Sequence, residues 1–330
     1  MDAAATCFAG IDVSKDTLDG CLLLPGGKAK EHTFGNDARG HAALLAWADR
    51  HAAGRPVHFC MEATGPYSEA IATHLADAGR HVSVVNPTRI KYAGLARGRG
   101  NKTDRADAKL IAEYAQREHP PAWPPPSPEV RELQALVRRL DDLTEAAARE
   151  KGRLASPALT PAVRKSVTRV VRLLEREAAR LRAAADDLVA ATPALAADRD
   201  LLESIPGVGR QTATTILAEL PPVDRLPGAQ SAAASCGLSP REFTSGTSVR
   251  KKTRLSKAGN PRLRKALFLP TQTAVRFNPL LRGFFDRLVA AGKPKLQAIG
   301  ACMRKLIMIA YGVLRNRAPF DPAWASRIAP

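Results

Sequence analysis

The chain has 330 residues and a formal net charge of +18, from 50 lysines and arginines against 32 aspartates and glutamates. That length is enough for one large core and allows two or more domains. The composition, with 45% hydrophobic and 25% charged residues, is that of a globular protein and excludes a low-complexity chain. The excess of positive charge favours a polyanionic partner, and nucleic acid is the leading class.

The cysteines and the apolar segments indicate a cellular compartment. There are five cysteines, an odd number, widely spaced and without the spacing of metal ligands, as in proteins of a reducing cytoplasm. They are Cys7, Cys21, Cys60, Cys236 and Cys302. No signal peptide is recognisable, and the longest apolar run, 306–314, is too short to span a bilayer. We therefore expect a soluble cytoplasmic protein with no membrane partner.

Residues 1–120 have the pattern of an α/β domain. Apolar stretches at 8–13, 18–24 and 32–34 predict an antiparallel meander. A helix capped by Asp37, a strand at 57–61, a helix at 68–78 and a strand at 81–85 follow. Three meander strands followed by strand–helix alternation is the order of a ribonuclease H-like fold.

Four carboxylates occupy rigid positions in this domain. Asp12 lies in the first strand and Glu62 ends a later one, and a buried strand carboxylate is costly unless it is paired or binds metal. Asp104 and Asp107 begin a predicted helix capped by Thr103, where a three-residue spacing puts them on one face. The four could converge around two Mg²⁺ or Mn²⁺ ions. For the helix pair alone, an ordinary helix start with acids favoured by the macrodipole is the alternative.

A proline-dense segment, 119–128, marks the clearest domain boundary. Residues 129–191 then show apolar residues at three- and four-residue steps with a break at 156–161, which predicts two long amphipathic helices. They form either a coiled-coil arm used for dimerisation or a plain helical subdomain, and the pattern leaves both open. We expect domains at 1–120, 121–195 and 196–330, and a homo-oligomer, either a dimer or a tetramer.

The last domain is mainly helical by pattern and contains two features suited to nucleic acid. Gly207 and Gly209 lie in a turn between two predicted helices that looks like a helix-hairpin-helix, where glycines let backbone amides approach a phosphate. A tight helix–helix turn is the alternative. A basic run without acids follows, and it needs solvent or phosphates opposite it; a solvated face is the alternative. Its members are Arg250, Lys251, Lys252, Arg254, Lys257, Arg262, Arg264 and Lys265.

These segments together resemble the DEDD insertion-sequence transposases, relatives of the Piv and MooV DNA invertases. The resemblance rests on the strand with Asp12, the strand with Glu62, and the segments 102–108, 205–209 and 244–246, and it covers nearly the whole chain. It implies a RuvC-like first domain and a transposase that acts on donor and target DNA. It also implies a bridge RNA as guide and a serine nucleophile, which matches Ser245.

The residues alone do not choose Ser245, because other hydroxyls lie nearby in what we predict to be a polar loop before the basic run. Lys102 and Arg105 flank the acids and could position phosphates. The strongest rival function is a metal-dependent nuclease, such as a Holliday-junction resolvase, without a covalent intermediate. A non-enzymatic binding protein does not explain the acids, since a scaffold gains nothing from carboxylates that face phosphates.

Overall fold

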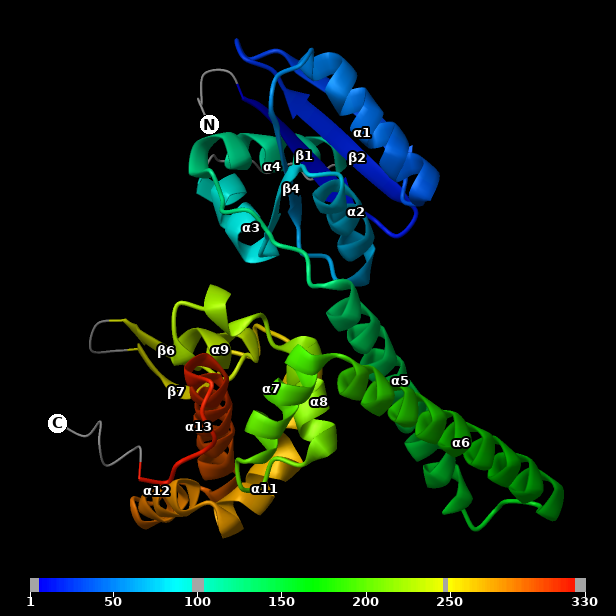
Figure 1. Ribbon diagram of the computed structural model, residues 1–330, viewed down its shortest axis with the longest axis vertical. Coiled ribbons are helices and arrows are strands. Elements are labelled where there is room, and N and C mark those ends of the chain that lie inside the picture. The colour runs from blue at the N-terminus through cyan, green and yellow to red at the C-terminus, as the bar shows by residue number, and fades with distance from the viewer. Residues whose placement is uncertain (1–5, 97–103, 246–248, 324–330) are drawn as a thin grey trace. The chain divides into compact units, whose positions relative to one another are not determined.

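The computed structural model describes residues 6–96, 104–245 and 249–323, and the chain divides into two compact units, Met1–Pro126 and Ser127–Pro330. The first unit is built on a mixed five-stranded sheet in the order β3-β2-β1-β4-β5 (Figure 1). β1 to β3 form an antiparallel meander, and β4 and β5 run parallel to β1. The strands are β1 Cys7–Val13, β2 Thr17–Leu23, β3 Ala29–Gly35, β4 Val57–Glu62 and β5 His81–Val85. This is the succession that the sequence predicts.

Helices cover both faces of this sheet. α1 (Ala38–Ala52) and α2 (Pro66–Asp77) pack on one face, and α3 (Pro87–Ala96) and α4 (Asp104–Glu118) on the other. Asp37 begins α1 as predicted, because its carboxylate accepts a hydrogen bond from the Gly40 amide at 2.7 Å. α3 was not predicted from the sequence. Thr103, the predicted cap of α4, lies outside the described residues.

The proline-dense segment runs along the edge strand β5. The Trp123 amide donates to the Val82 carbonyl at 2.6 Å, and the Ser83 hydroxyl lies 2.9 Å from the Pro120 carbonyl and 2.8 Å from that of Pro121. Proline has no amide hydrogen to donate to a strand. The prolines can therefore only accept, and the single hydrogen of the Ser83 hydroxyl is shared between the carbonyl oxygens of Pro120 and Pro121.

The second unit begins with an arm of two long packed helices, α5 (Pro128–Leu154) and α6 (Pro161–Ala191), drawn in green in Figure 1. Ser127 caps α5 and Thr160 caps α6, and each cap precedes a proline in the first turn. Proline is preferred there because the first amide has no partner within the helix. The predicted break at 156–161 coincides with the connection between these helices.

The rest of the second unit is mostly helical, as predicted, around α13 at the centre of its core. Its helices are α7 Pro193–Glu203, α8 Arg210–Glu219, α9 Ala229–Ser235, α10 Pro261–Ala266, α11 Phe268–Phe277, α12 Pro279–Ala290 and α13 Lys295–Asn316, with a 3₁₀ turn at Val223–Arg225. A hairpin of β6 (Pro240–Ser245) and β7 (Val249–Leu255) was not predicted. In the described part of the chain, α13 alone has the length and hydropathy of a membrane span, and its residues Cys302, Leu306 and Ala310 are fully buried in this core.

Candidate active site and nucleic-acid contacts

Asp12 and Glu62 lie side by side at the ends of two parallel strands. The paired residues Ile11 of β1 and Met61 of β4 immediately precede them. Ile11 and Met61 belong to the core under α1 and α2. Because side chains alternate along a strand, Asp12 and Glu62 face the other side of the sheet, the side that α4 covers. Both residues are half-buried.

α4 lies directly on β1 at Gly10. A Cβ atom at Gly10 would be 2.1 Å from the Ala108 carbonyl oxygen and 2.3 Å from the Ala112 nitrogen, so only glycine allows this approach. Asp107 precedes Ala108 and is half-buried. Gly10 lies two residues before Asp12 on β1. Its contact with α4 therefore fixes the position of Asp107 relative to Asp12.

The remaining members of the predicted site are described only in part. Asp104 and Arg105 begin α4, but their side chains lie outside the description, as does all of Lys102. Among the described residues, no group of three or more His, Cys, Asp or Glu could hold a metal ion. The donor chemistry nevertheless fits Mg²⁺ or Mn²⁺, because all four predicted ligands are carboxylates. The described residues thus supply part of a donor set.

Asp19 is an acid of this face that the sequence analysis missed. It pairs directly with Asp12 across the antiparallel strands β1 and β2 and is half-buried. Carboxylates directly opposite each other on a sheet repel, and the Thr33 hydroxyl donates to Asp19 at 2.5 Å. The tight turn at residues 14–17 sets this register. Pairing the residues on the two sides of this turn, starting from Val13 and Leu18, would have placed Asp19 opposite Asp12.

Two buried thiols, Cys60 and Cys21, lie on this side of the sheet. Burial, with the negative charge of Glu62 adding to it, raises the pKa of Cys60 to about 12. Burial also raises the pKa of Cys21 to about 11. Both thiols stay protonated at neutral pH, and the thiolate is the form that binds metal or attacks.

Ser245 is the last residue of β6 and pairs with Val249 of β7. The expected loop position is therefore wrong, because residues on both sides of a short glycine-containing connection pair as strands. This is a recognisable hairpin pattern, and it was overlooked. Thr244 pairs with Arg250, which places the start of the basic run on the neighbouring strand. Residues 246–248, and the side chains of 242–253, lie outside the description.

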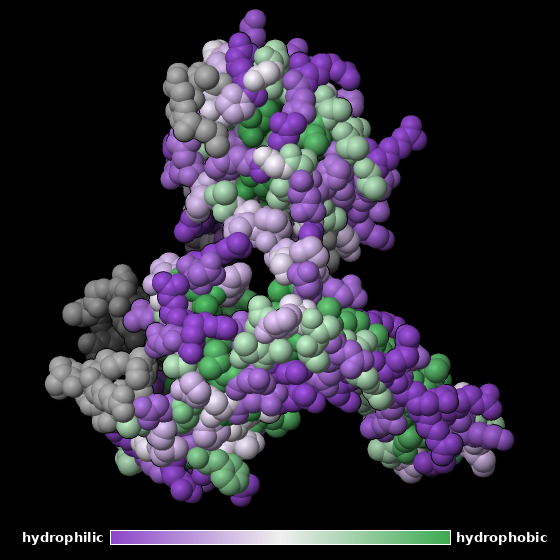
Figure 2. Space-filling model, in the orientation of Figure 1, coloured by the Kyte–Doolittle hydropathy of each residue, from purple (hydrophilic) through white to green (hydrophobic). Residues whose placement is uncertain are grey.

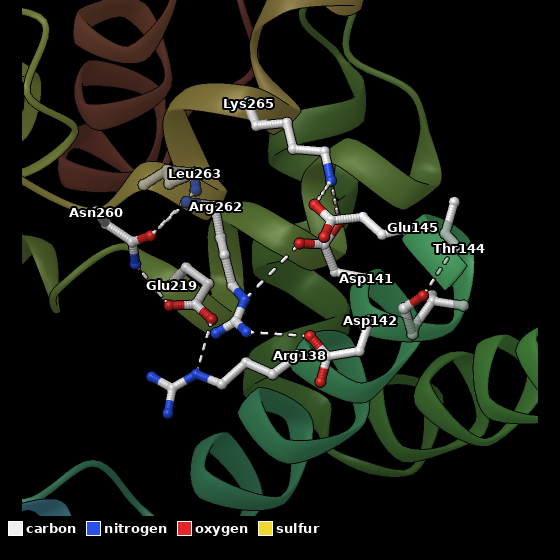
Figure 3. Close-up of polar contacts among 11 residues, drawn as sticks. Arg138, Asp141, Asp142, Thr144, Glu145, Glu219, Asn260, Arg262, Leu263 and Lys265 are labelled. Carbon is white, nitrogen blue, oxygen red and sulfur yellow. Dashed lines mark hydrogen bonds and ion pairs between the residues drawn. The ribbon is translucent and has the colours of Figure 1, made fainter. Parts of the chain in front are cut away.

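The basic run has two different environments. Arg254 and Lys257 are exposed, and Arg250, Lys251 and Lys252 belong to β7. Arg262 and Lys265, in contrast, make ion pairs with acids of α5 (Figure 3). The pairs are Arg262 with Asp141 and Asp142, at 3.7 and 3.3 Å, and Lys265 with Asp141 and Glu145, both at 2.6 Å.

Arg264 donates to the carbonyl oxygens of Cys236 and Lys257. The expectation that the whole run needs solvent or phosphates opposite it is therefore wrong for Arg262, Arg264 and Lys265. Protein groups distant in sequence fill that place.

A buried carboxylate joins the same helices. Glu219 of α8, with a side chain 2% exposed, accepts from Arg138 of α5 at 2.9 Å and from Asn260 at 2.6 Å (Figure 3). The side-chain oxygen of Asn260, Oδ1, in turn caps α10 by accepting hydrogen bonds from backbone amides of its first turn. Arg138, Glu219 and Asn260 thus connect the arm to α8 and α10, a role that no local sequence pattern indicates.

The two glycines of the α7–α8 turn differ. Gly207 has φ +100°, and a Cβ there would lie 2.6 Å from Ala274 of α11, so close packing requires glycine. Gly209 begins α8, is exposed, and has open space around it. The turn is tight because of helix packing at Gly207, and it is accessible at Gly209.

Comparisons with known proteins agree with this architecture. A DEDD-type IS110 transposase model, described as Transposase, matches residues 9–160, and one described as Transposase IS116/IS110/IS902 family matches residues 199–286. The pilin gene-inverting proteins of Moraxella bovis and Moraxella lacunata are each 34% identical over 318 residues, which cover 95% of this chain and 97% of theirs. An uncharacterized 43.6 kDa protein of insertion element IS110 from Streptomyces coelicolor is 33% identical over 116 residues, 35% of this chain and 28% of that protein.

The α/β unit carries carboxylates at its strand ends, and the helical unit carries cationic segments. This combination suits an enzyme that acts on nucleic acid. The matches make the class specific: the chain belongs to the IS110 family of transposases, enzymes of DNA recombination.

Proposed function

We propose that the protein cleaves and exchanges DNA strands at a metal-dependent site formed by Asp12, Glu62, Asp104 and Asp107. The observation that carries this proposal is the placement of Asp12 and Glu62 on adjacent strand ends, on the face where Gly10 seats α4. Grouped carboxylates facing phosphates are unfavourable unless cations neutralise them. A folded domain that retains such a group is best explained by metal-assisted phosphoryl chemistry.

The chain's own residues would bind and position. When bound, Mg²⁺ or Mn²⁺ would activate an attacking oxygen and stabilise the leaving oxygen of a phosphodiester. The two strand ends give Asp12 and Glu62 rigid supports, and the contact at Gly10 holds α4 against them. Lys102 and Arg105 would contact the phosphates beside the cleaved bond.

Ser245 is our proposed nucleophile. Its Oγ would attack the scissile phosphorus and lose its proton, while the bond to the leaving strand breaks and that strand's oxygen is protonated. The resulting phosphoserine link conserves the phosphodiester energy for rejoining. A serine hydroxyl needs a base, a metal or positive charge to react. Arg250 and the cations after it on β7 support this role, because they belong to the strand that pairs with Ser245.

The finer architecture and partners belong to the same proposal. The first unit would be a ribonuclease H-like, RuvC-like domain, α5 and α6 a coiled-coil arm, and the α7–α8 turn a helix-hairpin-helix-like phosphate contact at Gly209. The boundaries 1–120, 121–195 and 196–330 express this division. A bridge RNA would select donor and target DNA, and the two gene-inverting relatives support inversion as one outcome of strand exchange.

The test compares Asp12→Asn and Glu62→Gln with Asp16→Asn, an exposed acid close to Asp12 in sequence. With Mg²⁺ and nicked DNA substrates, the first two variants should keep the native circular dichroism spectrum and lose cleavage at least 100-fold. Asp16→Asn should cleave normally. Cleavage at the wild-type rate by Asp12→Asn would contradict the metal-site assignment.

A second arm of the test addresses the serine. Wild-type protein should form a covalent adduct with suicide DNA, and Ser245→Ala should form none while still binding DNA. If the wild type cleaves with metal but never forms an adduct, the resolvase-like nuclease function is the correct one.

A further inference from the structure

The first half of α6 carries a row of cations on one face of the arm. Lys165, Arg169, Arg172 and Arg176 follow the spacing i, i+4, i+7, i+11, which places them on one side of a helix. Arg164 joins them along one shallow open groove. All five are exposed, and we call them the basic face of the arm. Figure 2 shows that the surface of the arm is mainly hydrophilic.

Acids in the described part of the chain do not neutralise these cations. None of the five has an ion-pair partner in the part of the chain that the structure describes. Glu175, the acid in the groove, pairs instead with Lys151 of α5 at 2.6 Å. Like charges at i, i+4 destabilise a helix by a few tenths of a kcal/mol per pair. The first turn also lacks an acid, although the helix macrodipole favours negative charge there.

The second half of the same helix is different. Arg180 pairs with Glu177, three residues away on α6, and Asp186 accepts ion pairs from Arg199 and Arg210. The accumulation of unpaired charge is therefore local to the first half. Packing does not require it either, because α6 packs on α5 through another side, which includes Val171 and Ala178.

We propose that the basic face binds the phosphate backbone of duplex DNA. From Lys165 to Arg176 it spans about 17 Å of helix axis, the length of about five base-pair steps at 3.4 Å each. Four of its five cations are arginines, whose guanidinium groups bind phosphate with paired hydrogen bonds. The inference rests on the proposed function in that DNA is the substrate, and it adds a contact far in sequence from the acids and from Ser245.

The test measures binding of the full-length protein to a fluorescent 30-bp duplex of arbitrary sequence in EDTA, over a series of salt concentrations. The variant Arg169→Gln/Arg172→Gln removes two members of the basic face. The control, Arg139→Gln/Arg149→Gln, removes the same charge from exposed positions of α5, the other helix of the arm. Each lost phosphate contact should lower the log–log salt slope by about 0.9, so the first variant should lose about 1.8 and the control much less.

Three results for the Arg169→Gln/Arg172→Gln variant would overturn the proposal. They are a salt slope equal to that of the wild type, weaker binding to RNA with unchanged binding to duplex DNA, or a changed oligomeric mass in light scattering. The slope is measured without divalent metal, so it is independent of catalysis. If Asp12→Asn still cleaves DNA, the metal-site proposal fails while a reduced slope still supports the basic face. If the wild type does not bind duplex DNA, both proposals fall.

Discussion

Gly10 is the residue on which the geometry of the acidic site depends most. The atoms nearest to its missing side chain are backbone atoms of α4, which cannot rotate away as a side-chain end can. Any substitution must therefore move the helix that carries Asp107 relative to the strand that carries Asp12. Gly10 therefore contributes to the site without contacting any substrate. It allows α4 to pack on β1, and this packing sets the position of Asp107 relative to Asp12.

We expect Gly10→Ala to lower the free energy of unfolding by about 3 kcal/mol, the upper range for forced overpacking, and to reduce DNA cleavage more than DNA binding. Urea denaturation and a cleavage assay under native conditions measure the two effects. The control is Gly152→Ala in α5, where an added Cβ meets nothing within 4 Å. That change should be neutral or stabilise the protein by up to about 1 kcal/mol, because alanine favours helix. A Gly10→Ala protein with wild-type stability and cleavage would show that α4 is not fixed by this contact.

Elements formed by local signals were predictable from the sequence, and those that depend on distant partners were not. A regular apolar repeat indicates the arm helices in the sequence. The residues Ser127 and Thr160, each followed by proline, are typical of helix starts. Asp12 and Glu62 were predicted because a carboxylate in an apolar strand stands out. In contrast, Lys265 meets Asp141 across 124 residues, and only the folded chain reveals that contact. Asp19 was missed for a different reason: the turn at residues 14–17 that sets the register is local, and the strand pairing on either side of it was not worked out.

The junction of α5, α8 and α10 allows a prediction at the scale of elements. Glu219 is buried, and Arg138 and Asn260 donate to it. Removing one partner of a buried ion pair leaves a charge without compensation and typically costs about 3 to 5 kcal/mol. Because Arg138 is 26% exposed, we expect Arg138→Met to cost somewhat less, about 2 to 3 kcal/mol, in the unfolding of the second unit.

Lys265→Gln serves as the control for this junction. It breaks ion pairs with Asp141 and Glu145 that are much more exposed, and such pairs contribute at most about 1 kcal/mol. Thermal or urea unfolding of both variants gives the comparison. If Arg138→Met and Lys265→Gln lowered the free energy of unfolding equally, the ion pair with Glu219 would not be the main polar contact between the arm and the helices α8 and α10.

The whole molecule is expected to self-associate through the arm. Val163, Val170 and Leu173 on α6 are 46%, 40% and 51% exposed, and their spacing of seven and three residues forms one apolar stripe. Because about half of each side chain is already buried, covering the rest would stabilise by about 1 kcal/mol each, and a symmetric dimer would gain this on both arms. By helical spacing this stripe borders the basic face at Leu173, which is four residues from Arg169, and turns away from it at Val163 and Val170.

Val170→Gln/Leu173→Gln should therefore shift the protein toward monomer in multi-angle light scattering without changing its helix content. Glutamine removes the apolar contact and adds no charge, so the salt slope of DNA binding per protomer should stay as in the wild type. The Arg169→Gln/Arg172→Gln variant should show the reverse: an unchanged mass and a lower slope. A wild type that is monomeric both alone and on DNA would refute self-association through the arm. A joint loss of mass and slope in either variant would mean that DNA binding itself depends on the paired arms.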